Sequence, residues 1–140
     1  MPPFRRSRGQ ASPDALEALG AFDVTLRLVE EAKTALVATV RTGRAQGIPL
    51  AEGVAAFEDG LHRAAASMGA WRSPPAESVR GACDAALRES LRRAERLRLE
   101  GSPRIYEELI AALDEVIEPL EPFADASARL RAQARGAAPG

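Results

Sequence analysis

The sequence predicts an all-α fold, namely an antiparallel four-helix bundle of two helical hairpins with a kinked or separate short C-terminal fifth helix. Apolar residues recur at alternating spacings of three and four, which is the periodicity of an amphipathic helix. Aromatic residues make up only 4% of the chain and no window alternates with period two, so strands are not expected. Glycine and proline separate the helical stretches, and the short loops they predict favour neighbouring helices of opposite direction.

Residues 13–135 are expected to form a single domain, because 140 residues with 46% hydrophobic content can bury a core without disulfides. Residues 1–12 are expected to be a flexible basic arm and residues 136–140 a frayed tail. The single cysteine, Cys83, falls among apolar helix positions. It is therefore expected to be a small buried hydrophobe.

The first helix carries the strongest periodic signal. Ser12 is expected to be its N-cap and Pro13 its first residue. An unbroken helix to about Arg44 would be about 45 Å long. Gly20 is a possible break, which would leave a separate short helix at the start.

The second helix is expected to open at Pro49 and to reach Trp71, the only tryptophan. Gly53 and Gly60 weaken this helix but permit close approach of a neighbour. Trp71 is expected to cap the core where the two hairpins meet. Residues 73–75, Ser-Pro-Pro, then predict the start of the third helix.

Two prolines interrupt the fourth helix, and a kink or short break is expected between Glu118 and Pro122. The fourth helix would then span only about 24 Å, against about 45 Å for the first. The unequal lengths can be accommodated in two ways. In the first, residues 123–135 continue along the same line as the fourth helix and pack beside the rest of helix one. In the second, the end of helix one is left for a partner to cover, which implies a dimer.

The function predicted first is a non-enzymatic helical-bundle protein that acts in the cytoplasm through protein–protein interaction, as a homodimer or as a small subunit of a larger assembly. Its interface is expected on the apolar stripe of helix one and on the last helix. Lys33 lies within that stripe, where a charge fixes register or oligomeric state, or extends along the helix towards Glu30. The expected interface residues are Leu19, Phe22, Leu26, Val29, Lys33, Leu36, Val40, Phe123 and Leu130.

A nucleic-acid-associated accessory subunit is the alternative. Its contacts would come from the N-terminal arm and from the arginine-rich face of helix three. However, the chain has a net charge of −1, and many of the arginines have a carboxylate four residues away, so few counterions would be released on binding phosphate. Aromatic residues for base stacking do not interleave with them. The possible contact residues are Arg5, Arg6, Arg8, Arg92, Arg93 and Arg96.

A carboxylate–metal enzyme of the helical pyrophosphatase type is the second alternative, with Glu30, Glu31, Glu107 and Glu108 as ligands. The sequence lacks the Glu-x-x-Asp spacing that such enzymes need, and His62, the only histidine, is expected to be exposed. No catalytic set is recognisable, so an enzyme is not expected. Cofactors, small-molecule ligands and membrane spans are not expected either.

Overall fold

The computed structural model describes residues 12–46, 50–101 and 106–136, and the predicted all-α class is confirmed, because no strand occurs within these ranges. The predicted arm, apart from Ser12, and residues 137–140 of the predicted tail lie outside the described residues. None of the helices in these ranges is both long and apolar enough to cross a membrane. The elements are α1 (Pro13–Gln46), α2 (Leu50–Ser67), a 3₁₀ turn (Met68–Ala70), α3 (Pro74–Glu100), α4 (Tyr106–Ile117), a second 3₁₀ turn (Glu118–Leu120) and α5 (Pro122–Ala134).

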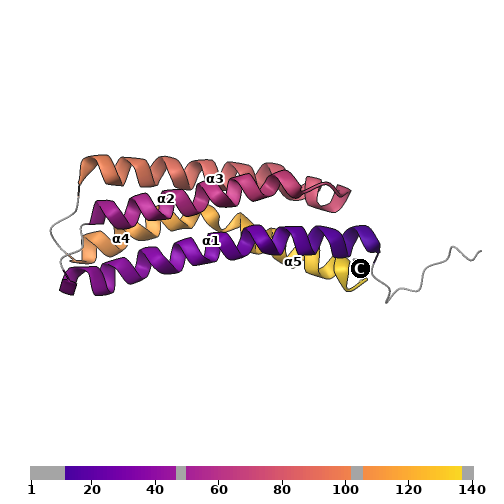
Figure 1. Ribbon diagram of the computed structural model, residues 1–140, viewed down its shortest axis with the longest axis horizontal. Coiled ribbons are helices and arrows are strands. Elements are labelled where there is room, and N and C mark those ends of the chain that lie inside the picture. Colours follow the sequence, from indigo (N-terminus) through magenta and orange to yellow (C-terminus); the bar gives the residue numbers. More distant parts are fainter. Residues whose placement is uncertain (1–11, 47–49, 102–105, 137–140) are drawn as a thin grey trace, which may run out of the picture.

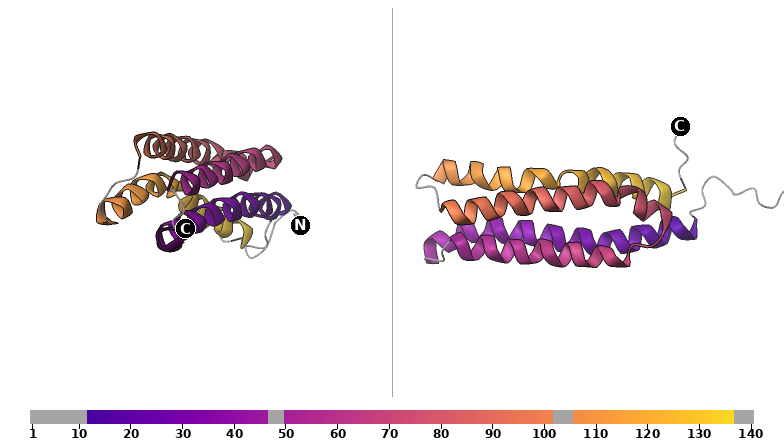
Figure 2. Two further views of the ribbon diagram at one scale, coloured as in Figure 1. Left: turned by 60° about the vertical axis from the view of Figure 1, so that its left-hand side comes forward. Right: turned by 90° about the horizontal axis from the view of Figure 1, so that it is seen from above.

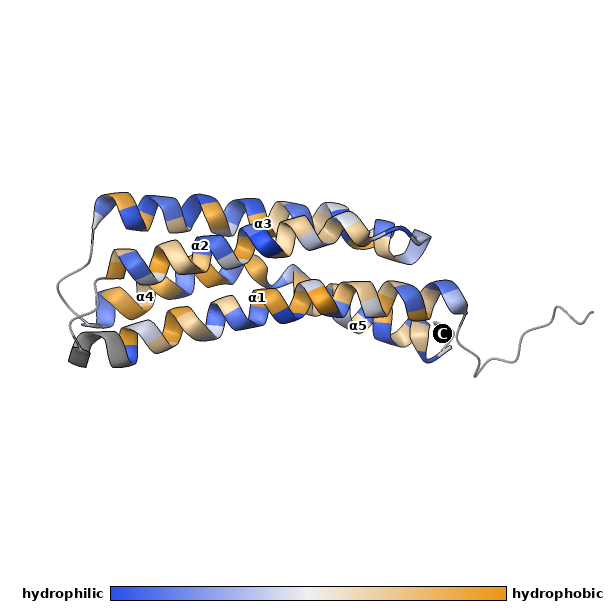
Figure 3. Ribbon diagram, in the orientation of Figure 1, coloured by the Kyte–Doolittle hydropathy of each residue, from blue (hydrophilic) through white to orange (hydrophobic). Residues whose placement is uncertain are grey.

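The helices lie side by side along one long axis (Figure 1). Helix α1 contacts α2 along its length, α2 contacts α3, and α4 and α5 follow one another in a single row beside α3 (Figure 2). Hydrophobic and hydrophilic residues alternate around each helix, as amphipathic packing requires (Figure 3). One continuous core runs through the described helices.

Helix α1 is continuous, so the possible break at Gly20 does not occur. The N-cap prediction is confirmed, because the backbone N–H of Ala15 donates to Ser12 Oγ at 3.0 Å. The helix ends at Gln46, two residues beyond the predicted end, and its 34 residues span about 51 Å.

The contact between α1 and α2 depends on two glycines of α2. A Cβ atom at Gly60 would lie 2.8 Å from Ala32 Cβ, and one at Gly53 would lie 2.9 Å from Thr39 Cβ. Both distances are shorter than real Cβ contacts allow. The predicted close approach is therefore confirmed at both positions.

Trp71 is buried in the turn between α2 and α3, which we call the central turn. Its burial is as predicted, but it lies outside the second helix. Helix α2 ends at Ser67, and the 3₁₀ turn places Trp71 at its C-cap with extended backbone angles. The indole ring contacts Phe22 of α1 at a centroid distance of 5.8 Å. Phe22 in turn stacks on Phe123 of α5 at 6.1 Å. These three rings join the central turn to α1 and α5.

A chain of hydrogen bonds satisfies the polar groups around Trp71. Ser67 Oγ donates to the carbonyl of Ala64 at 2.7 Å, so its oxygen accepts from Thr25 Oγ1 at 2.5 Å. Thr25 Oγ1 accepts in turn from Trp71 Nε1 at 3.2 Å. Every hydroxyl in this buried chain therefore has a donor and an acceptor, and the buried Thr25 is stabilised in the core.

Arg80 of α3 holds the backbone of the same turn. Its Nη2 donates to the carbonyls of Met68 at 3.0 Å and Trp71 at 2.8 Å. Its guanidinium lies 5.6 Å from the centroid of the Trp71 ring, within cation–π range. The turn is thus fixed by side chains from α1 and from α3.

Replacing Ser73 by alanine is expected to lower the free energy of unfolding by less than about 0.5 kcal/mol or to raise it. An N-cap serine normally contributes about 1 kcal/mol, but Ser73 makes no cap hydrogen bond and its Oγ is buried without a partner among the described residues. Removing a buried hydroxyl that lacks a partner costs little. The measurement is urea unfolding followed by circular dichroism. Ser12→Ala, which removes a real cap, is the matched control, and an equal loss in both variants would contradict the account.

Cys83 is expected to be unreactive towards iodoacetamide at pH 8 in the folded protein. Burial raises the pKa of its thiol to about 11, and only the thiolate reacts. Mass spectrometry should find little labelling without denaturant and rapid labelling in urea. Fast labelling of the folded chain would show that Cys83 is accessible.

Candidate interaction groove

The break between α4 and α5 shapes the most distinctive surface of the described structure. Pro119 has no backbone N–H, so the carbonyl of Glu115 loses the donor that a continuous helix would provide. Arg93 Nη1 donates to this carbonyl at 2.8 Å, and Ser90 Oγ donates to the carbonyl of Val116 at 2.6 Å. Both donors belong to α3, so the break is fastened to α3.

Helix α4 lies against α3 rather than against α1. Helix α5 packs against both α1 and α3, whereas the close helix contact of α4 is with α3. Beside α4, the outer face of α1 therefore keeps exposed residues, among them Thr34, Val37 and Ala38. Val37, a large hydrophobic residue, is 36% exposed.

Two adjoining hollows form along this uncovered part of α1. One, of about 630 Å³, lies between α1, the break and the start of α5. The other, of about 510 Å³, continues along α1 beside Ile117. They share Glu30, Lys33 and Ile117. We call the pair the α1 groove and define it by Glu30, Lys33, Val37, Ala38, Asp114, Ile117, Glu118 and Glu121.

The acidic part of the α1 groove is its larger hollow. Four carboxylates and one ammonium group line that hollow, which gives a net charge of −3, whereas the smaller hollow has Lys33 and Arg41 beside the single carboxylate of Glu30. Lys33 Nζ lies 3.3 Å from Glu30 Oε2, which confirms that this lysine extends towards Glu30. Within the described part of the chain, Asp114, Glu118 and Glu121 make no ion pair. These three carboxylates therefore carry charge without an ion pair among the described residues, and Glu118 also lines the hollow that holds Arg92, Arg93 and Arg96.

The predicted interface residues lie mostly inside the chain. Helix α5 continues the row of α4 and covers α1, so the first of the two solutions for the unequal helix lengths is the observed one (Figure 1). Leu19, Leu26 and Lys33 remain partly exposed, and Leu26 and Lys33 line the α1 groove. The other six residues are buried in this chain's own core and offer no surface to a partner in this structure: Phe22, Val29, Leu36, Val40, Phe123 and Leu130.

The arginine-rich face of α3 is largely neutralised by nearby carboxylates. Arg92 Nη2 and Arg93 Nε lie 2.5 Å and 2.8 Å from Glu89 Oε2. Hydrogen bonds from Arg92 and then Arg93 lower the pKa of the Glu89 carboxyl to about 2. Arg96 makes no ion pair with another described residue.

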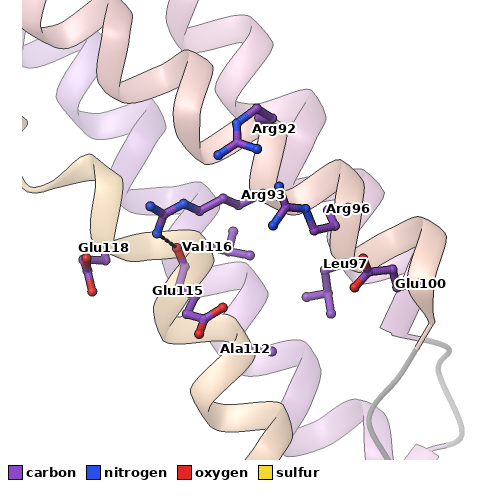
Figure 4. Close-up of a pocket in the computed structure, with 9 residues that line it drawn as sticks. All are labelled: Arg92, Arg93, Arg96, Leu97, Glu100, Ala112, Glu115, Val116 and Glu118. Carbon is purple, nitrogen blue, oxygen red and sulfur yellow. Dashed lines mark hydrogen bonds between the residues drawn. The ribbon is translucent and has the colours of Figure 1, made fainter.

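These arginines share a hollow of about 470 Å³ with Glu100, Glu115 and Glu118, and Figure 4 shows Arg93 reaching across to α4. Equal numbers of basic and acidic side chains make this hollow a poor site for phosphate. Arg5, Arg6 and Arg8 of the predicted nucleic-acid surface lie outside the described residues.

The residues considered for metal binding are not gathered into a site. Glu30, Glu31, Glu107 and Glu108 are all exposed, as is His62. Across the described ranges, no group of three or more histidine, cysteine, aspartate or glutamate residues could hold a metal ion.

Of the residues that line the groove, Leu26, Val29, Lys33 and Phe123 were expected at an interface and Glu30 at a metal site. Others were not expected at any site, namely Val37, Ala38, Asp114, Ile117, Glu118 and Glu121. The sequence does carry one signal, because Asp114, Glu118 and Glu121 flank the predicted proline break. Spacing alone could not show that Val37, on a different helix, stays exposed near this break.

No family model matches the chain, and no curated protein or solved structure matches it.

Proposed function

We propose that the protein is a non-enzymatic helical bundle, built from two antiparallel hairpins, that acts in the cytoplasm by binding another protein along the α1 groove. The observation that carries this proposal is the uncovered apolar strip of α1 beside a wall of carboxylates that lack ion-pair partners in the described structure. An apolar floor with a polar rim is the usual composition of a protein–protein interface. The partner is a second copy or a different protein in a larger assembly.

The size of the groove also suits a protein partner. It extends along α1 from Leu26 to Arg41, which is about 22 Å at the rise of an α-helix. Its smaller hollow is lined by Val37, Ala38 and Ile117 together with Thr34 and the charged side chains of Glu30, Lys33 and Arg41. A segment of three to four helical turns would cover this length.

An affinity pull-down with a groove-filling variant tests the proposal. Ala38→Trp places a bulky side chain in the groove without changing charge, whereas Ala85→Trp makes the same change at an exposed position of α3. A partner recovered by the wild type and by Ala85→Trp, but lost by Ala38→Trp, is the expected result. Equal recovery by all three proteins would place the contact elsewhere.

Light scattering after size-exclusion chromatography decides whether the partner is a second copy. A dimer that dissociates in Ala38→Trp would assign the groove to self-association. A clean monomer that recovers no protein in the pull-down would contradict the proposed function.

A further inference from the structure

We propose that the α1 groove takes a basic amphipathic helix of a partner protein, with apolar residues on one face and arginine or lysine along its edge. This inference rests on the proposed function, and it adds the chemistry of the partner.

The floor follows the helical repeat of α1. Residues 30, 33, 37 and 41 and residues 30, 34 and 38 lie three or four apart, and Val37 and Ala38 are its apolar members among the charged side chains of Glu30, Lys33 and Arg41. Ile117, the last residue of α4, closes the floor from the other side. A helix laid along such a floor places its anchors at positions i, i+3, i+4 and i+7.

The wall decides the charge of that helix. Asp114 and Glu118 stand one helical turn apart on the row of α4, and Glu121 follows across the break. All three carboxylates are exposed and have no ion-pair partner among the described side chains. Basic residues four apart on a bound helix would meet the first two, while an acidic helix would be repelled.

The test can also identify two other occupants of the groove. The first is a second copy of this chain, whose α3 carries exposed arginines at positions 88, 92 and 96. The second is the chain's own N-terminal stretch, which carries Arg5, Arg6 and Arg8 before Ser12. The first would appear as concentration-dependent self-association of the purified chain.

Fluorescence anisotropy with synthetic peptides tests the proposal on the full chain. The probe is a labelled amphipathic helix of about 18 residues with leucine on one face and arginine on its edges, long enough to be helical when bound. Three controls have the same length: a scrambled leucine/arginine peptide, a leucine/glutamate peptide and a leucine/glutamine peptide. Binding is measured at about 50 mM salt, where charge contacts are weakly screened.

The leucine/arginine helix is expected to bind more tightly than all three controls. The double variant Asp114→Asn/Glu121→Gln should weaken this binding about three- to tenfold, as the loss of two exposed ion pairs would. Glu107→Gln/Glu108→Gln makes the same charge change on α4 outside the groove and should have less than about a twofold effect. Equal loss in the two variants, or equal binding of the leucine/glutamate helix, would overturn the proposal.

Ala38→Trp separates this proposal from the proposed function. If an uncharged or acidic helix binds best and Ala38→Trp abolishes that binding, the groove is a docking site and the partner class is wrong. If Ala38→Trp changes the binding of no peptide, the proposed function fails as well. Self-association of the chain, or much tighter peptide binding after Arg5, Arg6 and Arg8 are changed to glutamine, would assign the groove to one of the other two occupants.

Discussion

Replacing Trp71 by alanine is expected to lower the free energy of unfolding by about 3–5 kcal/mol, the range for truncating a large core side chain. Trp71 is only 2% exposed, and its ring touches Phe22 of α1 and lies beneath the guanidinium of Arg80 of α3. The substitution also removes the donor to Thr25 Oγ1, which is buried between helices. Urea unfolding followed by circular dichroism measures the effect without relying on tryptophan fluorescence.

Trp71→Phe is the informative control for this prediction. It keeps an aromatic ring against Phe22 but removes Nε1, so the loss should be intermediate, near the 1–3 kcal/mol of a buried polar group left without its partner plus some lost packing. A loss below about 1 kcal/mol for Trp71→Ala, typical of a surface change, would mean that the indole does not hold the central turn.

Replacing Gly60 by alanine is expected to lower the free energy of unfolding by about 1–3 kcal/mol, as overpacking a core does. The new Cβ atom would lie 2.8 Å from Ala32 Cβ, which is fixed to the backbone of α1 and cannot move away by rotation. The helix-propensity gain of about 1 kcal/mol for glycine to alanine opposes this loss and does not cancel it. The helices must therefore separate locally.

Gly20→Ala and Gly81→Ala are the matched controls. Each glycine lies inside a long helix, and a Cβ atom at either position would have no described atom within 4 Å, leaving aside its own helix backbone. Both substitutions should therefore raise the free energy of unfolding by up to about 1 kcal/mol. A stabilising effect of Gly60→Ala of the same size would show that α1 and α2 are not in close contact there.

The helix pattern could be predicted from the sequence because it depends on local periodicity and on the backbone chemistry of single residues. Ser12 begins α1, the Ser-Pro-Pro of residues 73–75 begins α3, and Pro119 ends α4 nearly where the spacing indicates. Whether α1 breaks at Gly20 could not be decided from the sequence, for a physical reason. A glycine weakens a helix by about 1 kcal/mol, and the buried residues around it, among them Ala18 and Phe22, supply the tertiary contacts that offset this cost.

The candidate site could not be predicted in the same way. The stripe of α1 was expected at an interface because spacing identifies an apolar face but not which element covers it. In the structure α2, α3 and α5 pack against α1 and most of that stripe is buried, while Val37 stays exposed near the proline break that Ser90 and Arg93 fasten to α3. Those two hydrogen bonds join residues more than 20 positions apart, which no local pattern encodes.

Site-specific photo-cross-linking tests the central claim most directly, namely that the protein binds a partner along the α1 groove. A photoreactive phenylalanine analogue would replace Val37 in one protein and Ala85, on the exposed face of α3, in another. With the partner recovered by the pull-down, the account predicts strong cross-linking from position 37 and little from position 85. Cross-links from position 85 but not from position 37 would contradict the account, because the partner would then lie on a face that the groove does not reach.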